Sequence, residues 1–142
     1  MLLEHGPCLE RASADTGRGH FLFERRLSDW KFETRAVGDG GSVYLANHVG
    51  GGEGDYPARL RLMYGKGPLV LHALRQALAK HAGSVEAGDR LFLSWIRAIV
   101  RNFTRKLVET RHLVAILNQM TSTDWQPWFE RYVYGSEVPE VK

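Results

Sequence analysis

The sequence predicts a mainly helical fold, in which a compact unit of about four helices follows an irregular, glycine-rich N-terminal third. Three observations lead to this prediction. Hydrophobic residues make up 44% of the 142 residues and aromatic residues 11%, which is enough to form a core. Apolar residues recur with the 3.6-residue helical period from Pro57 onward. Residues 38–54 hold seven of the fifteen glycines, a density at which regular structure is entropically costly.

The N-terminal third carries two charged clusters, at residues 9–13 and 23–33, and no clear periodicity. We therefore interpret residues 1–41 as an irregular segment and residues 42–142 as the helical unit. Residues 42–46 are expected to form a short strand, because they read Ser-Val-Tyr-Leu-Ala between two glycine-rich turns.

Two helices are predicted in the middle of the chain. Gly67 and Pro68 begin the first, since proline is favoured at the first helical position, and Gly83 is expected to end it in the left-handed conformation. Asp89 is the predicted N-cap of the second helix. This second helix has a wide apolar face made of Phe92, Trp95, Ile96, Ile99, Val100 and Phe103.

Two shorter helices are predicted in the C-terminal part. Thr110 is the expected cap of the third helix, whose apolar face is Leu113, Ile116, Leu117 and Met120. The fourth helix has three candidate caps, Ser122, Thr123 and Asp124, and Gly135 is expected to end it. Its aromatic residues have helical spacing, which indicates core packing rather than a cofactor or peptide groove: Trp125, Trp128, Phe129 and Tyr132.

Several function classes lack their signature in these residues. The six histidines include no H-E-x-x-H pair, so they are interpreted as exposed or hydrogen-bonded side chains, and no metal or cofactor site is predicted in this chain. Cys8 is the single cysteine, which excludes an internal disulfide. The net charge of +3 is small. A basic ridge along and after the second helix is interpreted as a solvated helix face; it consists of Arg97, Arg101, Arg105, Lys106 and Arg111. We therefore expect no nucleic-acid partner.

Neither a long apolar run nor a secretory signal is present, so no membrane partner is expected either. The compartment stays open, with the cytoplasm favoured.

Residues 64–75, YGKGPLVLHALR, resemble the Y-x-K-G-a-x-v-L-h-x-L-r stretch of the aminopeptidase N family, which are zinc metallopeptidases of the gluzincin type. The resemblance continues in order along residues 42–141. Residues 88–92 match the G-D-x-x-F helix start of the family, Thr110 with Leu113 fits its next helix, and residues 124–135 fit its ending. The resemblance implies the C-terminal helical lobe of a thermolysin-like catalytic domain.

In that family, the tyrosine before x-K-G donates a hydrogen bond to the oxyanion of the tetrahedral intermediate during peptide hydrolysis. By resemblance, this catalytic role falls on Tyr64, with Gly65 and Gly67 holding it at the mouth of a cleft. Arg59 and Arg61 lie just before it and could face the same cleft, but no role is given to them. Zinc and a peptide substrate are the cofactor and ligand that the resemblance implies for a complete parent enzyme.

The chain departs from the family pattern, because H-E-x-x-H, the later zinc-binding glutamate and the motif that binds the substrate amino terminus are all missing. We expect the chain to be inactive alone and to be a fragment, a truncated gene product or a degenerate paralogue. Its expected partner is the remainder of the catalytic domain or a second copy, held through exposed apolar surface. The alternative function is a non-catalytic helical scaffold or protein-interaction domain derived from the same fold.

Overall fold

The computed structural model describes residues 18–37, 41–44, 46 and 56–141. The fold is mainly helical, as predicted, and no strand occurs among these residues. None of the described helices is long and apolar enough to cross a membrane. The elements are α2 (Arg18–Val37), α3 (Tyr56–Arg61), the π-helical turn η1 (Leu62–Lys66), α4 (Gly67–Ala82), α5 (Val85–Phe103), α6 (Thr110–Thr121), α7 (Gln126–Phe129) and the π-helical turn η2 (Glu130–Tyr134).

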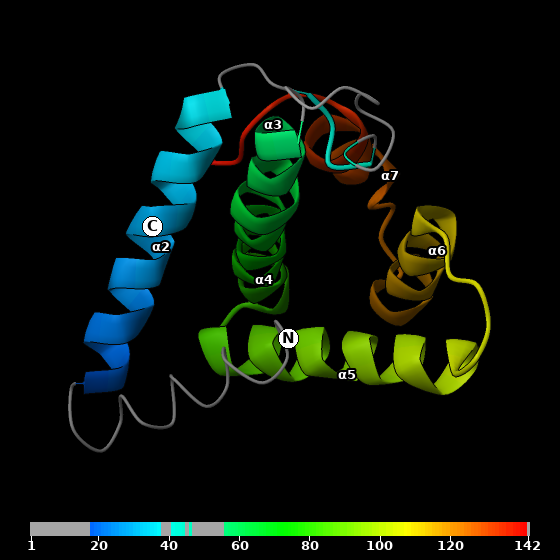
Figure 1. Ribbon diagram of the computed structural model, residues 1–142. Helices are drawn as coiled ribbons and strands as arrows, with labels where there is room; N and C mark the ends of the chain where they lie inside the picture. Colours follow the sequence, from blue (N-terminus) through cyan, green and yellow to red (C-terminus); the bar gives the residue numbers. More distant parts are fainter. Residues whose placement is uncertain (1–17, 38–40, 45, 47–55, 142) are drawn as a thin grey trace.

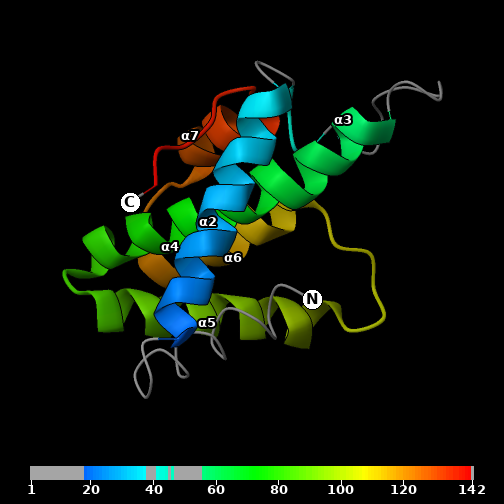
Figure 2. The same cartoon turned by 60° about the vertical axis from the view of Figure 1, so that its left-hand side comes forward.

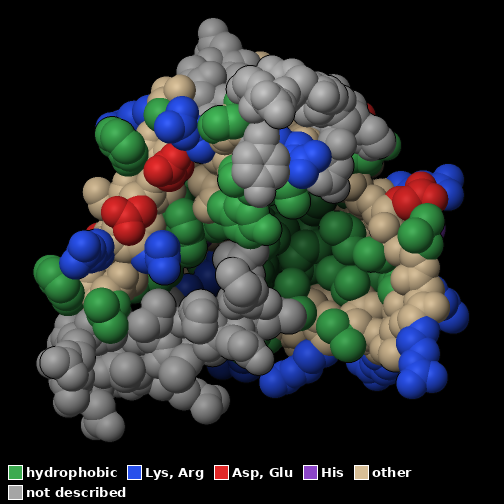
Figure 3. All heavy atoms as spheres, viewed as in Figure 1, with side chains coloured by type: hydrophobic (Ala, Val, Ile, Leu, Met, Phe, Trp, Pro, Cys, Tyr) green, Lys and Arg blue, Asp and Glu red, His purple; other side chains and the backbone are tan. Residues whose placement is uncertain are grey.

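The helices surround a central rod made of α3, η1 and α4, which follow one another without a break (Figure 1). Helix α2 lies on one side of this rod and contacts α3, η1 and α4, while α6 and α7 lie on the other side (Figures 1 and 2). Helix α5 runs across the lower end of α4 and carries the chain over to α6 (Figure 1). Hydrophobic side chains form the floor of the hollow between α4 and α6 (Figure 3).

The prediction of an irregular N-terminal segment is wrong for residues 18–37, which form α2. The physical reason is a narrow stripe of one residue per turn, with Phe23, Leu27, Trp30 and Thr34 spaced by three or four. Leu27 and Thr34 are buried, so tertiary packing stabilises a helix whose remaining surface is charged. The expected strand at 42–46 is also not formed, since residues 43 and 44 lie in a turn. Residues 1–17, 38–40 and 45 are outside the described residues.

The boundary between α4 and α5 agrees with the sequence at one end only. Gly83 ends α4 with φ +81°, in the left-handed region, as predicted. Asp89 is not the cap of α5, because the helix begins one turn earlier and the hydroxyl of Ser84 accepts a hydrogen bond from the Ala87 amide at 3.2 Å. Asp89 instead binds Arg75 of α4 through both carboxylate oxygens, at 2.5 and 2.6 Å, which ties the two helices together.

The two C-terminal helices begin and end near the predicted residues. Thr110 is the first residue of α6, and the cap is Glu109, whose amide donates to Nδ1 of His112 at 3.0 Å in a capping box. The N-cap of α7 is Trp125 rather than one of the three candidate caps, although Asp124 accepts a hydrogen bond from the Gln126 amide at 2.9 Å. Gly135 follows η2, as expected for the end of this helical segment.

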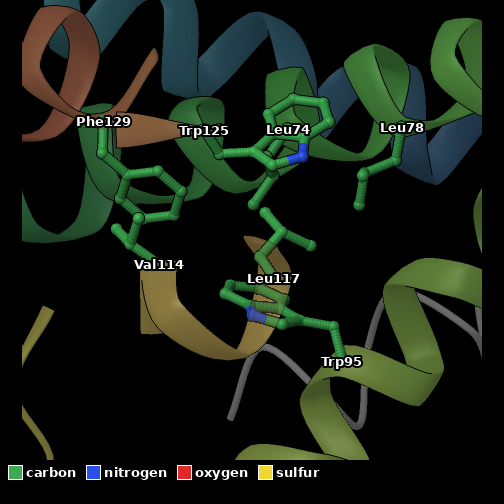
Figure 4. Close-up of a cluster of buried hydrophobic side chains, with 7 residues drawn as sticks. All are labelled: Leu74, Leu78, Trp95, Val114, Leu117, Trp125 and Phe129. Carbon is green, nitrogen blue, oxygen red and sulfur yellow. The ribbon is translucent and has the colours of Figure 1, made fainter. Parts of the chain in front are cut away.

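The core lies between α4, α5, α6 and α7 (Figure 4). Trp95 is the more deeply buried of its two tryptophans, and its indole Nε1 donates to the carbonyl of Leu113 at 2.9 Å, so the only polar atom of this side chain is satisfied. Trp125 and Phe129 are buried here, which confirms core packing for these two aromatic residues of the fourth helix, whereas Trp128 and Tyr132 are only half-buried. The cluster of buried side chains consists of Leu74, Leu78, Trp95, Val114, Leu117, Trp125 and Phe129.

Gly88 marks the point where α5 approaches α4 most closely. A Cβ atom there would lie 2.3 Å from the Ala79 Cα and 2.5 Å from its backbone nitrogen, distances that backbone atoms cannot relieve by rotating. Gly88→Ala gains about 1 kcal/mol of helix propensity, but forcing the helices apart costs more, so we expect a net loss of about 1–3 kcal/mol. Urea unfolding measures it.

Gly67 is the matched control for this substitution, because it also lies in a helix and its added Cβ would meet only Leu62 O at 3.7 Å. Gly67→Ala should therefore leave the free energy of unfolding unchanged or raise it by less than about 1 kcal/mol. Equal effects at the two glycines would contradict the close helix crossing at Gly88.

Candidate functional site

Tyr64 lies in η1, the π-helical turn in the middle of the central rod. In this turn the amide of Gly67 bonds to the carbonyl of Leu62, five residues back, so the helix is locally wider than an α-helix. The Tyr64 side chain is 58% exposed, and its phenol makes no hydrogen bond to the described part of the chain. Tyr64 is thus a hydrogen-bond donor that is available at the surface, next to the buried residues Gly65 and Lys66 of the same turn.

Gly65 allows α2 to lie directly against this turn. A Cβ atom at Gly65 would lie 3.0 Å from Glu33 Cβ and 3.3 Å from Thr34 Oγ1, so a larger residue would push α2 outward. The Thr34 hydroxyl is itself fixed, because it donates to the Trp30 carbonyl at 2.7 Å. The resemblance implies that Gly65 holds the tyrosine at the mouth of a cleft; in the structure, this glycine lets α2 lie close to the turn.

A groove of about 540 Å³ lies between α2 and the rod, with Tyr64 on its wall. Glu33 and Arg61 form an ion pair between the two walls at 3.1 Å, with both side chains about half exposed. Arg61 therefore faces the groove, as considered from the sequence, whereas Arg59 is not among the lining residues. The lining is amphipathic and comprises Arg26, Asp29, Trp30, Phe32, Glu33, Pro57, Leu60, Arg61, Tyr64 and Gly65.

Half of this groove comes from α2, the element that sequence reasoning missed. Its side-chain positions 26, 29, 30 and 33 fall on one helical face by the i, i+3, i+4, i+7 rule, which is the signal that could have identified them. Without the prediction of a helix at 18–37, these residues had no reason to be placed beside Tyr64.

Lys66, next in the same turn, is almost completely buried, with 1% of its surface exposed. Its ammonium group donates to the carbonyl of Gly41 at 2.9 Å and to that of Gly135 at 3.0 Å. Burial lowers the pKa of Lys66 below its ordinary value. The Lys66 nitrogen thus connects the turn that carries Tyr64 to the segments at Gly41 and Gly135, which are distant in sequence.

The turn after α2 packs against the end of η2 beside Lys66. Ser42 Oγ donates to the carbonyl of Val133 at 2.9 Å, and the amide of Tyr44 donates to the same oxygen at 3.1 Å. The rings of Tyr44 and Tyr134 lie 4.8 Å apart. This contact positions the carbonyls of Gly41 and Gly135, which accept hydrogen bonds from the Lys66 ammonium group.

A pH-dependent contribution to stability follows from the buried lysine. Because its pKa is lower in the folded chain than in the unfolded chain, the unfolded chain binds more protons between the two values. The free energy of unfolding therefore rises with pH between the folded and the unfolded pKa of Lys66. The contribution of Lys66 to this free energy is largest above the unfolded pKa of about 10.5 and is smallest below the folded pKa. A neutral amine keeps two N–H donors, enough for both carbonyls.

Lys66→Met removes this contribution. We expect the difference in unfolding free energy between the native chain and this variant to grow in favour of the native chain as pH rises from neutral toward about 10. Urea unfolding at a series of pH values measures the difference. Lys80→Met, at an exposed position in the last turn of α4, is the control and should show no such trend. A pH-independent difference for Lys66→Met would contradict the account.

No group of three or more histidine, cysteine or carboxylate side chains that could hold a metal occurs in the described ranges. The groove offers two carboxylates, Asp29 and Glu33, without a histidine beside them. These residues do not fit a zinc ion, which takes three or four ligands from the protein. The three histidines whose side chains are described make the local contacts expected of them: His72 lies 3.2 Å from the Gln76 amide, His81 packs on Trp125, and His112 caps α6. Cys8 lies outside the described residues.

Comparisons of the chain with protein-family models, with curated proteins and with solved structures give no match. The resemblance to the aminopeptidase N family therefore depends on the motifs alone, and the candidate site on the geometry above.

Proposed function

We propose that this chain is the C-terminal helical part of a zinc-dependent aminopeptidase catalytic domain, and that Tyr64 is its transition-state-stabilising residue. One observation carries the proposal. The phenol of Tyr64 lies on the wall of a groove and makes no hydrogen bond within the described part of the chain. Tyr64 belongs to a π-helical turn in which the two residues after it, Gly65 and Lys66, are buried. π-Helical turns are frequent at functional sites, because they aim a side chain that a regular helix would direct elsewhere.

The chemistry of the proposed role is hydrogen-bond donation to a developing negative charge. When a nucleophile attacks a peptide carbonyl, the oxygen becomes an oxyanion, and a donor already fixed at that position lowers the barrier without reorganising. The phenol of Tyr64 is such a donor, since Lys66 and Gly65 on its C-terminal side hold the backbone in place.

The groove supports a peptide as the ligand. Its volume of about 540 Å³ is in the range of small-ligand sites, and it combines the apolar surfaces of Trp30 and Phe32 with charged groups of both signs. An extended peptide of two or three residues has this same mixture of apolar side chains and polar backbone.

The chain alone is proposed to be inactive. Hydrolysis in this class of enzyme uses a zinc ion and a general-base glutamate, which activate water, and neither the ligand motif nor that glutamate is in the sequence. The residues of the groove do not fit the metal, so the remainder of the catalytic domain must supply it.

A complementation experiment tests the proposal. The DNA upstream of codon 1 is read in the same frame, and any segment that encodes H-E-x-x-H is produced and mixed with this chain. We expect no hydrolysis of an aminoacyl-coumarin substrate by either part alone, and chelator-sensitive hydrolysis by the mixture. Hydrolysis by the purified chain alone would contradict the proposed division of roles. The absence of any such upstream segment would favour the alternative, a non-catalytic helical scaffold or interaction domain.

A further inference from the structure

A cluster of cations stands at the C-terminal end of α5, on the opposite side of the core from the groove. Between Arg90 and Val108 the sequence contains five basic residues and no acidic residue. Lys and Arg side chains line the lower edge of the molecule, where α5 lies (Figure 3). We name the C-terminal end of α5 and the residues that follow it the basic tip, and define it as Val100, Arg101, Arg105, Lys106, Leu107 and Val108.

The charges of the basic tip are not neutralised within the described part of the chain. Ion pairs there join other residues, and Arg101, Arg105 and Lys106 take part in none of them. Glu109 is the acid next along the chain, but it already binds Arg111, with 2.9 Å between the Arg111 Nε and the carboxylate. The tip therefore presents net positive charge to whatever approaches it.

Large apolar side chains stand among these cations. Leu107 is 83% exposed, Val100 56% and Val108 45%. Leu107 lies in the connection between α5 and α6, so its side chain stands largely in solvent, next to the shallow apolar hollow that Val100 and Arg101 help to line. An isolated exposed leucine is ordinary, but three such side chains within a cationic cluster form a surface with two kinds of complementarity.

The turn is held in one conformation. The Lys106 amide donates to the Phe103 carbonyl at 2.9 Å, Thr104 Oγ1 donates to the Val100 carbonyl at 2.5 Å, and the capping box at Glu109 fixes the other side. Arg105 adopts φ +60°, a left-handed conformation that glycine or asparagine occupies at lower cost. Arg105 therefore occupies a position where the backbone favours another residue.

We propose that the basic tip docks on the surface of an anionic lipid bilayer, with Leu107 inserted at the level of the lipid headgroups and acyl chains. Lysine and arginine beside such a side chain contact the lipid phosphates, and each adds to the attraction. A duplex nucleic acid would use the cations but could take up the leucine only by unstacking a base step, which costs free energy, and a protein partner would need a pocket that accepts Leu107. Peripheral docking needs no membrane-spanning helix, so it is compatible with the absence of one among the described helices.

The test measures binding of the full chain to extruded vesicles by co-sedimentation. Vesicles of phosphatidylcholine with phosphatidylserine are compared with pure phosphatidylcholine, at about 0.1 M and about 1 M salt, where the Debye length falls from about 10 to about 3 Å. We expect binding to the mixed vesicles at the lower salt concentration only. Binding equal to both lipids, or none to the mixed vesicles, would overturn the proposal.

Two variants separate the apolar and the charged contributions. Leu107→Ala should weaken binding about tenfold, and the double variant Arg105→Gln, Lys106→Gln should weaken it about 30-fold. Val85→Ala is the matched control, since Val85 is 61% exposed at the other end of α5 and is followed by Glu86; it should bind as the native chain does. All four positions are exposed, so circular dichroism and melting should be unchanged.

Two further outcomes decide the kind of partner. If Leu107→Ala binds vesicles unchanged while the charge variant does not, the tip is a general polyanion site, and the lipid proposal is wrong. Displacement of the chain from mixed vesicles by short duplex DNA, at equal phosphate concentration, would likewise favour a nucleic acid. Tyr64→Phe should leave vesicle binding unchanged, because the groove and the tip are separate surfaces.

Discussion

Tyr64→Phe is expected to lower kcat of the complemented enzyme by about 100- to 1000-fold, with little change in KM. The substitution keeps the ring and removes only the phenol oxygen, so packing against the groove is preserved. Removing one preformed donor to an oxyanion typically has an effect of this size, equivalent to about 3–4 kcal/mol of barrier. An interaction made only in the transition state affects kcat and kcat/KM equally. Steady-state kinetics on an aminoacyl-coumarin substrate measure both constants.

Tyr44→Phe is the matched control for this prediction. Tyr44 is also about half exposed, and its ring packs on Tyr134 next to the Lys66 anchor, but it does not line the groove. Its loss of a phenol should leave kcat within about twofold. Unchanged turnover in Tyr64→Phe, or an equal loss in both variants, would remove the catalytic role from Tyr64 and favour a non-catalytic function.

The helical unit could be predicted because its signals are local. Helices α4, α5 and α6, and the segment formed by α7 and η2, have apolar residues at the 3.6-residue period. Residues such as Gly83 and Gly135 end a helix for reasons that lie within one turn of the chain. The wrong prediction of Asp89 as the cap of α5 also follows from reliance on local signals. Two residues, Ser84 and Asp89, were both able to cap, and only the contact of Asp89 with Arg75 of another helix separates them.

The candidate site was only half predictable, because its second wall depends on tertiary packing. Helix α2 has a stripe only one residue wide, which is weak evidence for a helix until Gly65 and η1 are there to cover it. The role of Lys66, next to Gly65, depends on tertiary packing even more. The hydrogen bonds of Lys66 reach 25 and 69 residues along the chain, to backbone oxygens that carry no sequence signature.

The x-K-G part of the motif thereby receives a physical interpretation that sequence alone does not provide. Lys66 holds the turn through hydrogen bonds to two distant carbonyls, and Gly65 lets α2 pack against it. Tyr64, on the same turn, stays exposed. The same three residues would serve a binding groove without chemistry. The kinetic comparison of Tyr64 with Tyr44 is therefore the measurement that separates an enzyme from a scaffold.

Trp95→Ala is expected to lower the free energy of unfolding by about 3–5 kcal/mol. Trp95 is the more deeply buried of the two tryptophans in the core, and it packs between α4 and α6 from its position on α5. The substitution leaves a cavity and also leaves the Leu113 carbonyl without its donor, and both effects act in the same direction. Against a total stability of about 5–15 kcal/mol, this loss is enough to unfold a marginal domain.

Trp95→Phe and Trp128→Ala identify the origin of that loss. Phenylalanine keeps most of the apolar volume but loses the hydrogen bond to Leu113, so we expect an intermediate effect. Trp128 is only half-buried and contacts Phe129 and Tyr132 at the edge of the core, so its replacement by alanine should cost less than half as much as Trp95→Ala. Urea unfolding followed by far-ultraviolet circular dichroism gives all three values. Equal losses at the two tryptophans would mean that α7 contributes as much to the core as α5 does, against the burial of these side chains.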